Sequence, residues 1–187
     1  MEKFSVIIPT MWRCVDVTKQ SLELFVNHEL VDQVIIINND VAKTPIWQVL
    51  QNSKVEIHNQ VENIFVNPAW NLGVALSRNN KLVIANDDII FDAKLLDRVY
   101  DKVIPENGVL GIITGEAVHN QPPTTDKEID FVTWRSGDII HCFGQLMFIH
   151  KSNWVDIIPE LKIYFGDDFI FHNQLYNNRR NMMIYNV

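Results

Sequence analysis

The chain has 187 residues and a formal charge of −7, with 47% hydrophobic and 10% aromatic residues. This length allows one domain with a sizeable core, and the composition excludes a disordered chain. The acidic balance argues against nucleic acid as a partner, because phosphate backbones are bound by basic surfaces. An anionic small molecule remains compatible with this charge if a metal ion or backbone N–H groups receive it.

The sequence shows neither a signal peptide nor a membrane span. The N-terminus lacks a basic region and a long apolar run, and no apolar window reaches the length that crosses a bilayer. The two cysteines, Cys14 and Cys142, are typical of reduced residues in a chain of this length. We therefore expect a cytoplasmic protein without a transmembrane segment.

Short apolar runs alternate with helical patterns through the first half of the chain. Helices are predicted after Asp16, from Asn67 and after Asp92, because apolar residues recur at helical spacing beyond each of these capping residues. This alternation predicts an α/β domain with a mainly parallel central sheet flanked by helices. The predicted strands of this half are residues 4–9, 34–37, 55–58 and 82–85.

The second half is less regular. Residues 116–130 are polar and contain a proline pair, which predicts a long surface loop. Helices are predicted after Ser152 and from Gly166. There is no linker and no internal repeat, so residues 1–187 are predicted to form a single domain. The predicted strands of this half are residues 109–114, 145–149 and 182–185.

Polar clusters follow three of the predicted strands, at residues 9–13, 38–40 and 86–88. Ligands of open α/β sheets bind outside the carboxyl ends of the strands, so we expect these clusters to share one rim of the sheet. Trp12 offers a flat aromatic ring, Asp40 a carboxylate acceptor, and the third cluster hard oxygen ligands. A nucleotide diphosphate with Mg²⁺ or Mn²⁺ uses all three kinds of group.

The acidic pair Asp87-Asp88 ends a buried apolar run. Adjacent carboxylates repel each other and lose hydration at such a position, and a divalent cation offsets that cost. Taken alone, the pair is also typical of a turn or a helix cap, Trp12 of a packing residue, and Asp40 of a turn. Their common location at strand ends favours a ligand site.

The order of these segments resembles that of the family 2 glycosyltransferases of GT-A fold. The resemblance covers essentially the whole chain, and it rests on order and spacing more than on any single motif. It implies a single GT-A domain, with residues 1–92 binding the sugar nucleotide and residues 93–187 binding the acceptor. The segments that carry it are Val6–Thr10, Ile36–Asp40, Asn71–Gly73, Ala85–Asp88, Gly144–Ile149 and Phe165–Phe169.

The resemblance also implies roles for individual residues. Residues 86–88 are similar to the family's Asp-x-Asp motif, with Asn86 in place of the first acid and Asp88 as the direct ligand of Mn²⁺ or Mg²⁺. His172 is a second candidate metal ligand, although a histidine here is also typical of a residue without a catalytic role. The residues implied to bind the sugar nucleotide are Pro9, Thr10, Trp12, Arg13, Asp40, Asn71, Asn86 and Asp87.

On the acceptor side, the resemblance implies a catalytic base at the start of the last predicted helix. Inverting members need one carboxylate that takes the proton of the attacking hydroxyl. Asp168 is assigned this role, and Asp167 is assigned to orient the loop or contact the acceptor, although either acid is also typical of a helix cap. Trp134 and Gly144 are the other residues implied on this side.

These features predict a metal-dependent, inverting glycosyltransferase of hexosyltransferase type. It would move a sugar from a nucleoside-diphosphate donor, with UDP favoured, to a hydroxyl group of a glycan or another saccharide. One alternative is a catalytically inactive protein that binds sugar nucleotides, which Asn86 keeps open. The other is a nucleotidyltransferase, although residues 9–14 lack the glycine-rich loop typical of that class.

Overall fold

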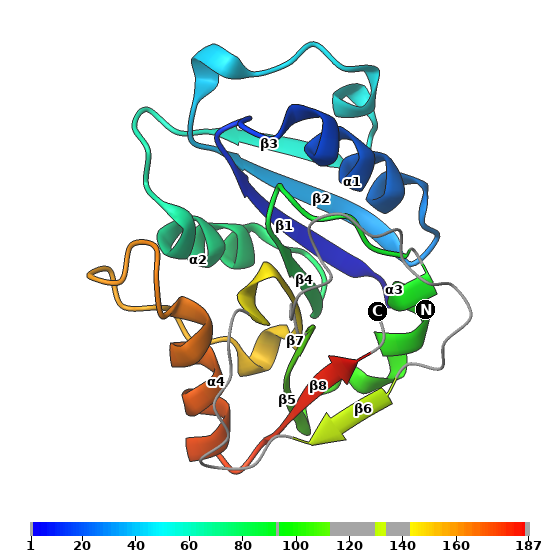
Figure 1. Ribbon diagram of the computed structural model, residues 1–187, viewed down its shortest axis with the longest axis vertical. Helices are drawn as coiled ribbons and strands as arrows, with labels where there is room; N and C mark the ends of the chain where they lie inside the picture. The colour runs from blue at the N-terminus through cyan, green and yellow to red at the C-terminus, as the bar shows by residue number, and fades with distance from the viewer. Residues whose placement is uncertain (1, 93, 113–129, 134–142, 186–187) are drawn as a thin grey trace.

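The computed structural model describes residues 2–92, 94–112, 130–133 and 143–185. In these parts of the chain, one sheet is covered by helices on both faces (Figure 1). This arrangement confirms the predicted α/β domain. None of the described helices has the length and hydropathy needed to cross a membrane.

One sheet runs through the described chain, and its strands are β1 (Phe4–Thr10), β2 (Val31–Asn38), β3 (Val55–Asn59), β4 (Lys81–Ala85), β5 (Asn107–Ile112), β6 (Asp130–Thr133), β7 (Leu146–His150) and β8 (Arg180–Tyr185). Their order is β3-β2-β1-β4-β7-β5-β8-β6. Neighbours pair in parallel except at β4–β7, β5–β7 and β6–β8. Of these described strands, only β6 and β7 are therefore reversed, and the prediction of a mainly parallel sheet is confirmed.

The α-helices of the described chain are α1 (Val15–Asn27), α2 (Val66–Leu76), α3 (Lys94–Val99) and α4 (Gly166–Tyr176). Helices α1 and α3 share a buried cluster with Val6 and Ile8 of β1, and α2 and α4 share another with Ile7. Successive side chains of a strand point to opposite faces, so both faces of β1 are buried. Short 3₁₀ helices lie at η1 (Val41–Lys43), η2 (Gln48–Gln51), η3 (Tyr100–Lys102), η4 (Phe143–Gln145) and η5 (Lys151–Asn153).

Two predicted helix caps are wrong. Helices α1 and α2 begin before Asp16 and Asn67, which lie in the first turns of their helices. Asp16 still places a negative charge where the helix dipole favours it, whereas the Asn67 side chain bonds to distant backbone carbonyls. The third prediction agrees with the structure, because Asp92 Oδ1 accepts the backbone N–H of Lys94 at 3.0 Å.

The second half departs further from the prediction. In the described chain, Ser152 lies in η5, and no α-helix forms between η5 and α4. The Asn71 side chain bonds to both backbone groups of Ile157, which holds this stretch in a non-helical conformation. Strand β6 was not predicted. The predicted loop at 116–130 lies outside the described residues, except for the first residue of β6.

Helix α2 approaches β1 closely at Gly73. A β-carbon built on Gly73 would lie 2.9 Å from Cγ1 of Ile7 and nearer still to its Cγ2. Ile7 is fully buried, so its side chain has little space into which it can move. The absence of a side chain at Gly73 therefore sets how deeply α2 lies on the sheet.

We expect Gly73→Val to lower the free energy of unfolding by about 1–3 kcal/mol, because overpacking forces side chains or backbone to shift. Urea denaturation followed by circular dichroism measures this change. Ala75→Val is the matched control, since Ala75 lies on the exposed face of the same helix. Equal unfolding free energies for the two variants would contradict the close-approach argument.

Candidate functional site

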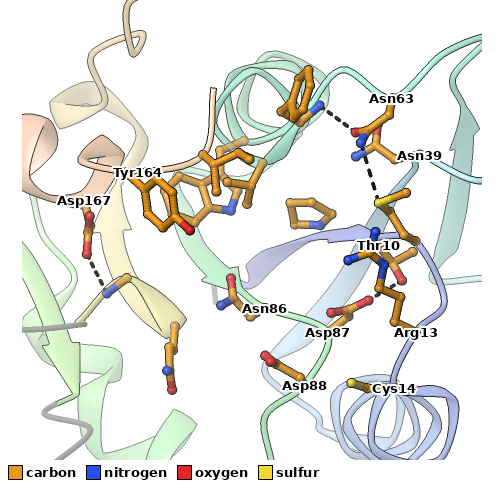
Figure 2. A pocket seen from close by; sticks show the side chains of 18 residues that line it. Thr10, Arg13, Cys14, Asn39, Asn63, Asn86, Asp87, Asp88, Tyr164 and Asp167 are labelled. Carbon is orange, nitrogen blue, oxygen red and sulfur yellow. Dashed lines mark hydrogen bonds between the residues drawn. The ribbon is translucent and has the colours of Figure 1, made fainter. Parts of the chain in front are cut away.

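A pocket opens where the strand order of the sheet reverses. The chain leaves β1 through α1 to β2 on one side, and it reaches β4 on the other side of β1 after α2, which covers the opposite face. Ligands of open α/β sheets bind at such a point, outside the carboxyl ends of the strands. The pocket has a volume of about 620 Å³ (Figure 2). Its lining residues are Pro9, Thr10, Met11, Arg13, Cys14, Asn39, Asn63, Phe65, Val66, Trp70, Asn86, Asp87, Asp88, Gly144, Gln145, Ile163, Tyr164 and Asp167.

Asp87 is the partly buried acid of this pocket. Its Oδ2 accepts a hydrogen bond from the Thr10 hydroxyl at 2.5 Å, and the same hydroxyl oxygen accepts the backbone N–H of Trp12 at 2.9 Å. Burial raises the pKa of Asp87, the Thr10 hydrogen bond opposes that rise, and the neighbouring Asp88 adds to it. Thr10 therefore links the end of β1 directly to the acidic loop after β4.

Helix α1 holds the acidic loop through two hydroxyl groups. Thr18 Oγ1 donates to the carbonyl oxygen of Asp87 at 2.7 Å, and Ser21 Oγ donates to the carbonyl oxygen of Ile89. Both hydroxyl-bearing residues are buried. The loop is thus fixed at the residues on both sides of Asp88, whose exposed side chain lies at the pocket (Figure 2).

The same end of the pocket has a negative electrostatic potential. Burial raises the pKa of the Cys14 thiol, and the negative charges of Asp87 and Asp88 raise it further, against the opposing charge of Arg13. Two carboxylates therefore outweigh the one guanidinium in their effect on this thiol. A cation bound beside Asp88 would be favoured by this potential.

Asparagine side chains form the opposite end of the pocket, which Figure 2 shows away from Asp88. Asn39 Oδ1 accepts the backbone N–H of Ile64 at 3.1 Å, and Asn63 Oδ1 accepts that of Phe65 at 2.8 Å. Sequence reasoning missed both residues. Asn39 belongs to the polar cluster after the second strand and could have been found there, whereas no pattern pointed to Asn63.

The start of α4 forms another wall. Asp167 lines the pocket, and its Oδ2 accepts the backbone N–H of Gly144 at 3.2 Å (Figure 2). A β-carbon on Gly144 would lie 2.8 Å from this oxygen, so the glycine permits the contact. Asp168 is half-buried and does not line the pocket. Trp134, the other residue predicted on this side, lies outside the described residues.

Three residues predicted to bind the sugar nucleotide make other contacts and do not line the pocket. Trp12 is 3% exposed, and its indole N–H donates to Asn38 Oδ1 at 2.8 Å, so the ring packs in the core and offers no open face. The carboxylate of Asp40 pairs with Lys43 at 2.7 Å. The Asn71 amide is bonded to the backbone of the segment before α4. Pro9, Thr10, Arg13, Asn86 and Asp87 do line the pocket.

The prediction that His172 shares a metal site with Asp88 does not fit the helix geometry. His172 lies five positions after Asp167 in the chain, so their side chains point about 140° apart around α4. His172 is exposed and does not line the pocket that Asp167 and Asp88 share. In the parts of the chain that the structure describes, no group of three or more His, Cys, Asp or Glu side chains could hold a metal ion.

Comparison with known proteins identifies the fold. No family model and no curated protein matches the sequence. Among solved structures, TarS 1-349 of S. aureus in complex with UDP has a TM-score of 0.72 at 15% identity, over 97% of this chain and 57% of that one. The chain therefore spans little more than half of that TarS structure.

Two other solved structures extend the likeness. GalNAc-T7 with UDP, GalNAc and Mn²⁺ has a TM-score of 0.66 at 11% identity, over 98% of this chain and 42% of that one. The mannosyltransferase PcManGT of Pyrobaculum calidifontis, in complex with GDP-Man and Mn²⁺, has a TM-score of 0.51 at 14% identity, over 60% of this chain and 35% of that one. The chain has the GT-A fold of nucleotide-sugar transferases, as the resemblance in the sequence implied.

We expect Thr18→Val to destabilise the protein by about 1–3 kcal/mol, because the nearly isosteric side chain leaves the Asp87 carbonyl without its hydroxyl donor. Thr18→Ser retains the hydroxyl and is the matched control. Urea denaturation of the three proteins measures the difference. If the valine variant is as stable as the wild type, the hydroxyl of Thr18 does not hold the acidic loop.

Proposed function

We propose that the chain is the catalytic domain of a metal-dependent, inverting glycosyltransferase of hexosyltransferase type. It transfers a sugar from a UDP-sugar to a hydroxyl group of a saccharide. The observation that carries this proposal is one pocket with Asp88 at the end of β4 and Asp167 at the start of α4. Solved GT-A structures that hold UDP or Mn²⁺ support the class of donor and metal.

The donor spans the carboxyl ends of β1, β2 and β4. Its nucleoside lies at the end of the pocket that carries the amides of Asn39 and Asn63, whose NH₂ groups can donate to a base or a ribose while their oxygens accept backbone N–H groups. Its diphosphate lies beside Arg13 and the acidic loop, and its sugar points toward Asp167. Residues 1–92 then supply most of the donor site, and residues 93–187 supply the acceptor side.

The acidic loop fits Mn²⁺ or Mg²⁺, because Asn86 and the two aspartates offer hard oxygen ligands. Asp88 is exposed at the pocket and is the direct ligand, whereas Asp87 is engaged by Thr10 and lies on the ribose side. One protein carboxylate suffices for such an ion when the donor phosphates complete its coordination. When bound, the ion stabilises the negative charge that develops on the departing diphosphate.

Asp168 is the proposed general base, the role that the resemblance implies for this half-buried residue, which adjoins Asp167 but does not itself line the pocket. It takes the proton of the acceptor hydroxyl as the oxygen attacks the anomeric carbon, while the bond to the diphosphate breaks on the opposite side of the sugar. Asp167 has a different task, because its carboxylate accepts the N–H of Gly144 and ties α4 to the turn before β7.

The cytoplasmic location inferred from the sequence stays a prediction.

We expect UDP together with Mn²⁺ to raise the melting temperature, and Mn²⁺ alone to have little effect, because the phosphates complete the metal site. At a ligand concentration 100 times Kd, the stabilisation is about 2.7 kcal/mol, or roughly 5–11 °C. Asp88→Ala should remove the part of the shift that depends on Mn²⁺. Glu62→Gln, which removes an exposed carboxylate outside the pocket, is the matched control.

GDP and dTDP, measured in the same way, test the preference for UDP. The absence of a shift with any of the three nucleotides would contradict the donor site. A shift without turnover of any UDP-hexose would instead favour a binding protein that has lost catalysis.

We expect Asp168→Asn to slow transfer by about 10²- to 10⁴-fold, which is the range for loss of a general base. UDP release from UDP-hexoses, measured with a mixture of oligosaccharide acceptors, reports the rate, and the shift in melting temperature with UDP and Mn²⁺ should remain. Asp167→Asn is the matched variant and should slow transfer less. The opposite order of the two variants would assign the base to Asp167.

A further inference from the structure

Two asparagines of α2 hold the segment between η5 and α4, and the first contact is made by Asn71. Asn71 Nδ2 donates to the carbonyl oxygen of Ile157 at 2.9 Å, and Asn71 Oδ1 accepts the N–H of the same residue at 3.0 Å. This pair of hydrogen bonds replaces the backbone partners that a strand or helix would provide. The segment therefore has a fixed starting point on α2.

A second asparagine fixes the end of the segment. Asn67 is fully buried, and its Nδ2 donates to the carbonyl oxygens of Leu161 at 2.9 Å and Tyr164 at 3.2 Å. The backbone N–H of Asn67 also donates to the carbonyl oxygen of Lys162 at 3.1 Å. Gly166 packs directly on the Asn67 amide, where a β-carbon would overlap it. The backbone of residues 161–166 is thus held in one position.

This fixed backbone presents two aromatic side chains to solvent. Tyr164 is 75% exposed and Phe165 is 66% exposed. Phe165 has φ 63°, in the left-handed region that is unfavourable for a bulky residue. Neither the exposure nor the backbone conformation stabilises the fold. Strained residues of this kind cluster at ligand sites, and Phe165 directly follows Tyr164 in the chain.

Tyr164 lies at the mouth of the donor pocket. It lines the pocket together with Asn86 and Asp167, and Figure 2 shows its ring on the side of Asp167, away from Asn39 and Asn63. The nucleoside end of the proposed donor is therefore remote from this ring. The ring faces the region where the transferred sugar meets the second substrate.

We infer that the Tyr164 ring forms a stacking platform for a pyranose ring of the acceptor saccharide. A pyranose has a flat face of C–H groups edged by hydroxyls, and a tyrosine offers an apolar ring with a polar hydroxyl at its tip. Rigid, exposed aromatics of this kind bind ligands at a small entropic cost. The inference rests on the proposed function, because it assigns the second substrate to the same pocket.

The exposure of the Tyr164 ring favours the acceptor over the donor as the occupant. The donor sugar is attached to a diphosphate at the acidic loop and occupies the inner part of the pocket, beside Asp167 and Gly144. The Tyr164 ring is mostly open to solvent, the direction from which a second substrate enters after the donor has bound. A saccharide stacked there brings a hydroxyl toward the acidic pair at the start of α4.

The test uses an array of immobilised oligosaccharides of defined structure, probed with the full chain in the presence of UDP and Mn²⁺. We expect Tyr164→Ala to weaken binding to the saccharides that the wild type retains by about tenfold, equivalent to about 1.4 kcal/mol. Tyr164→Phe keeps the ring and should retain most of the binding. Tyr176→Ala is the matched control, since Tyr176 is 87% exposed on α4 and does not line the pocket.

The shift in melting temperature with UDP and Mn²⁺, measured on the same proteins, separates the two proposals. If the wild type shows no shift, the proposed function fails. If it shows the shift, the platform is overturned by any of three results: no saccharide on the array is retained, Tyr164→Ala binds as the wild type does, or Tyr164→Ala also loses the shift, which would place the ring on the donor. An unchanged shift with weakened array binding supports the platform.

Discussion

The site depends on holding a partly buried carboxylate, Asp87, directly beside an exposed one, Asp88. Burial and the neighbouring charge both oppose ionisation of Asp87, which the rise in its pKa reflects. The Thr10 hydroxyl, at the end of β1, opposes the rise in the pKa of Asp87. Helix α1 holds the loop backbone through the hydroxyl groups of Thr18 and Ser21. The first strand and helix of the chain therefore determine the geometry of a loop that lies far along the sequence. Without these contacts, repulsion between the two carboxylates would favour a rearranged loop.

Much of the fold could be predicted from the sequence because strands buried on both faces consist of continuous apolar runs. The rim of the sheet was predictable for a related reason, since the carboxyl ends of parallel strands lie on one edge. Strand β6 is short and lies at the edge of the sheet, so it leaves no comparable apolar run. The helix predicted after Ser152 fails because a side chain from α2 imposes the local conformation, which no local pattern records.

Within each polar cluster, the sequence could not show which residue faces the pocket. Asn39 and Asp167 line the pocket. The sequence assigns the contact with the nucleoside to Asp40 and the role of catalytic base to Asp168, which are their neighbours in the chain. One step along a helix turns the side chain by about 100°, and one step in a turn changes its direction just as strongly. The sequence places a cluster at a strand end to within a residue or two. Only the tertiary structure decides the direction of each side chain.

Buried asparagines explain another part of the difference. An amide has two donors and an acceptor, so it can satisfy backbone groups where the chain forms neither helix nor sheet. Asn38 is fully buried at the end of β2 and bonds to Trp12, Thr44 and Asn59, which turns the indole away from the pocket and into the core. The resemblance assigns Asn71 to the donor, but both ends of its amide are bonded to the backbone of Ile157. A polar residue near a site is therefore ambiguous until its partners are known.

The reversed direction of β7 has a consequence for the separation between the two sides of the pocket. Because β7 runs against β4, its starting end lies beside the carboxyl end of β4, and the N–H of Asn86 donates to the carbonyl oxygen of Gln145 at 2.9 Å. Five residue pairs of β4 and β7, from Lys81–His150 to Ala85–Leu146, thereby position Gly144 and Asp167 relative to the acidic loop. A slip of two residues, the smallest that keeps each side chain on its own face, would displace one wall by about 7 Å. The register of the β4–β7 pair thus sets the distance between the acidic loop and the start of α4.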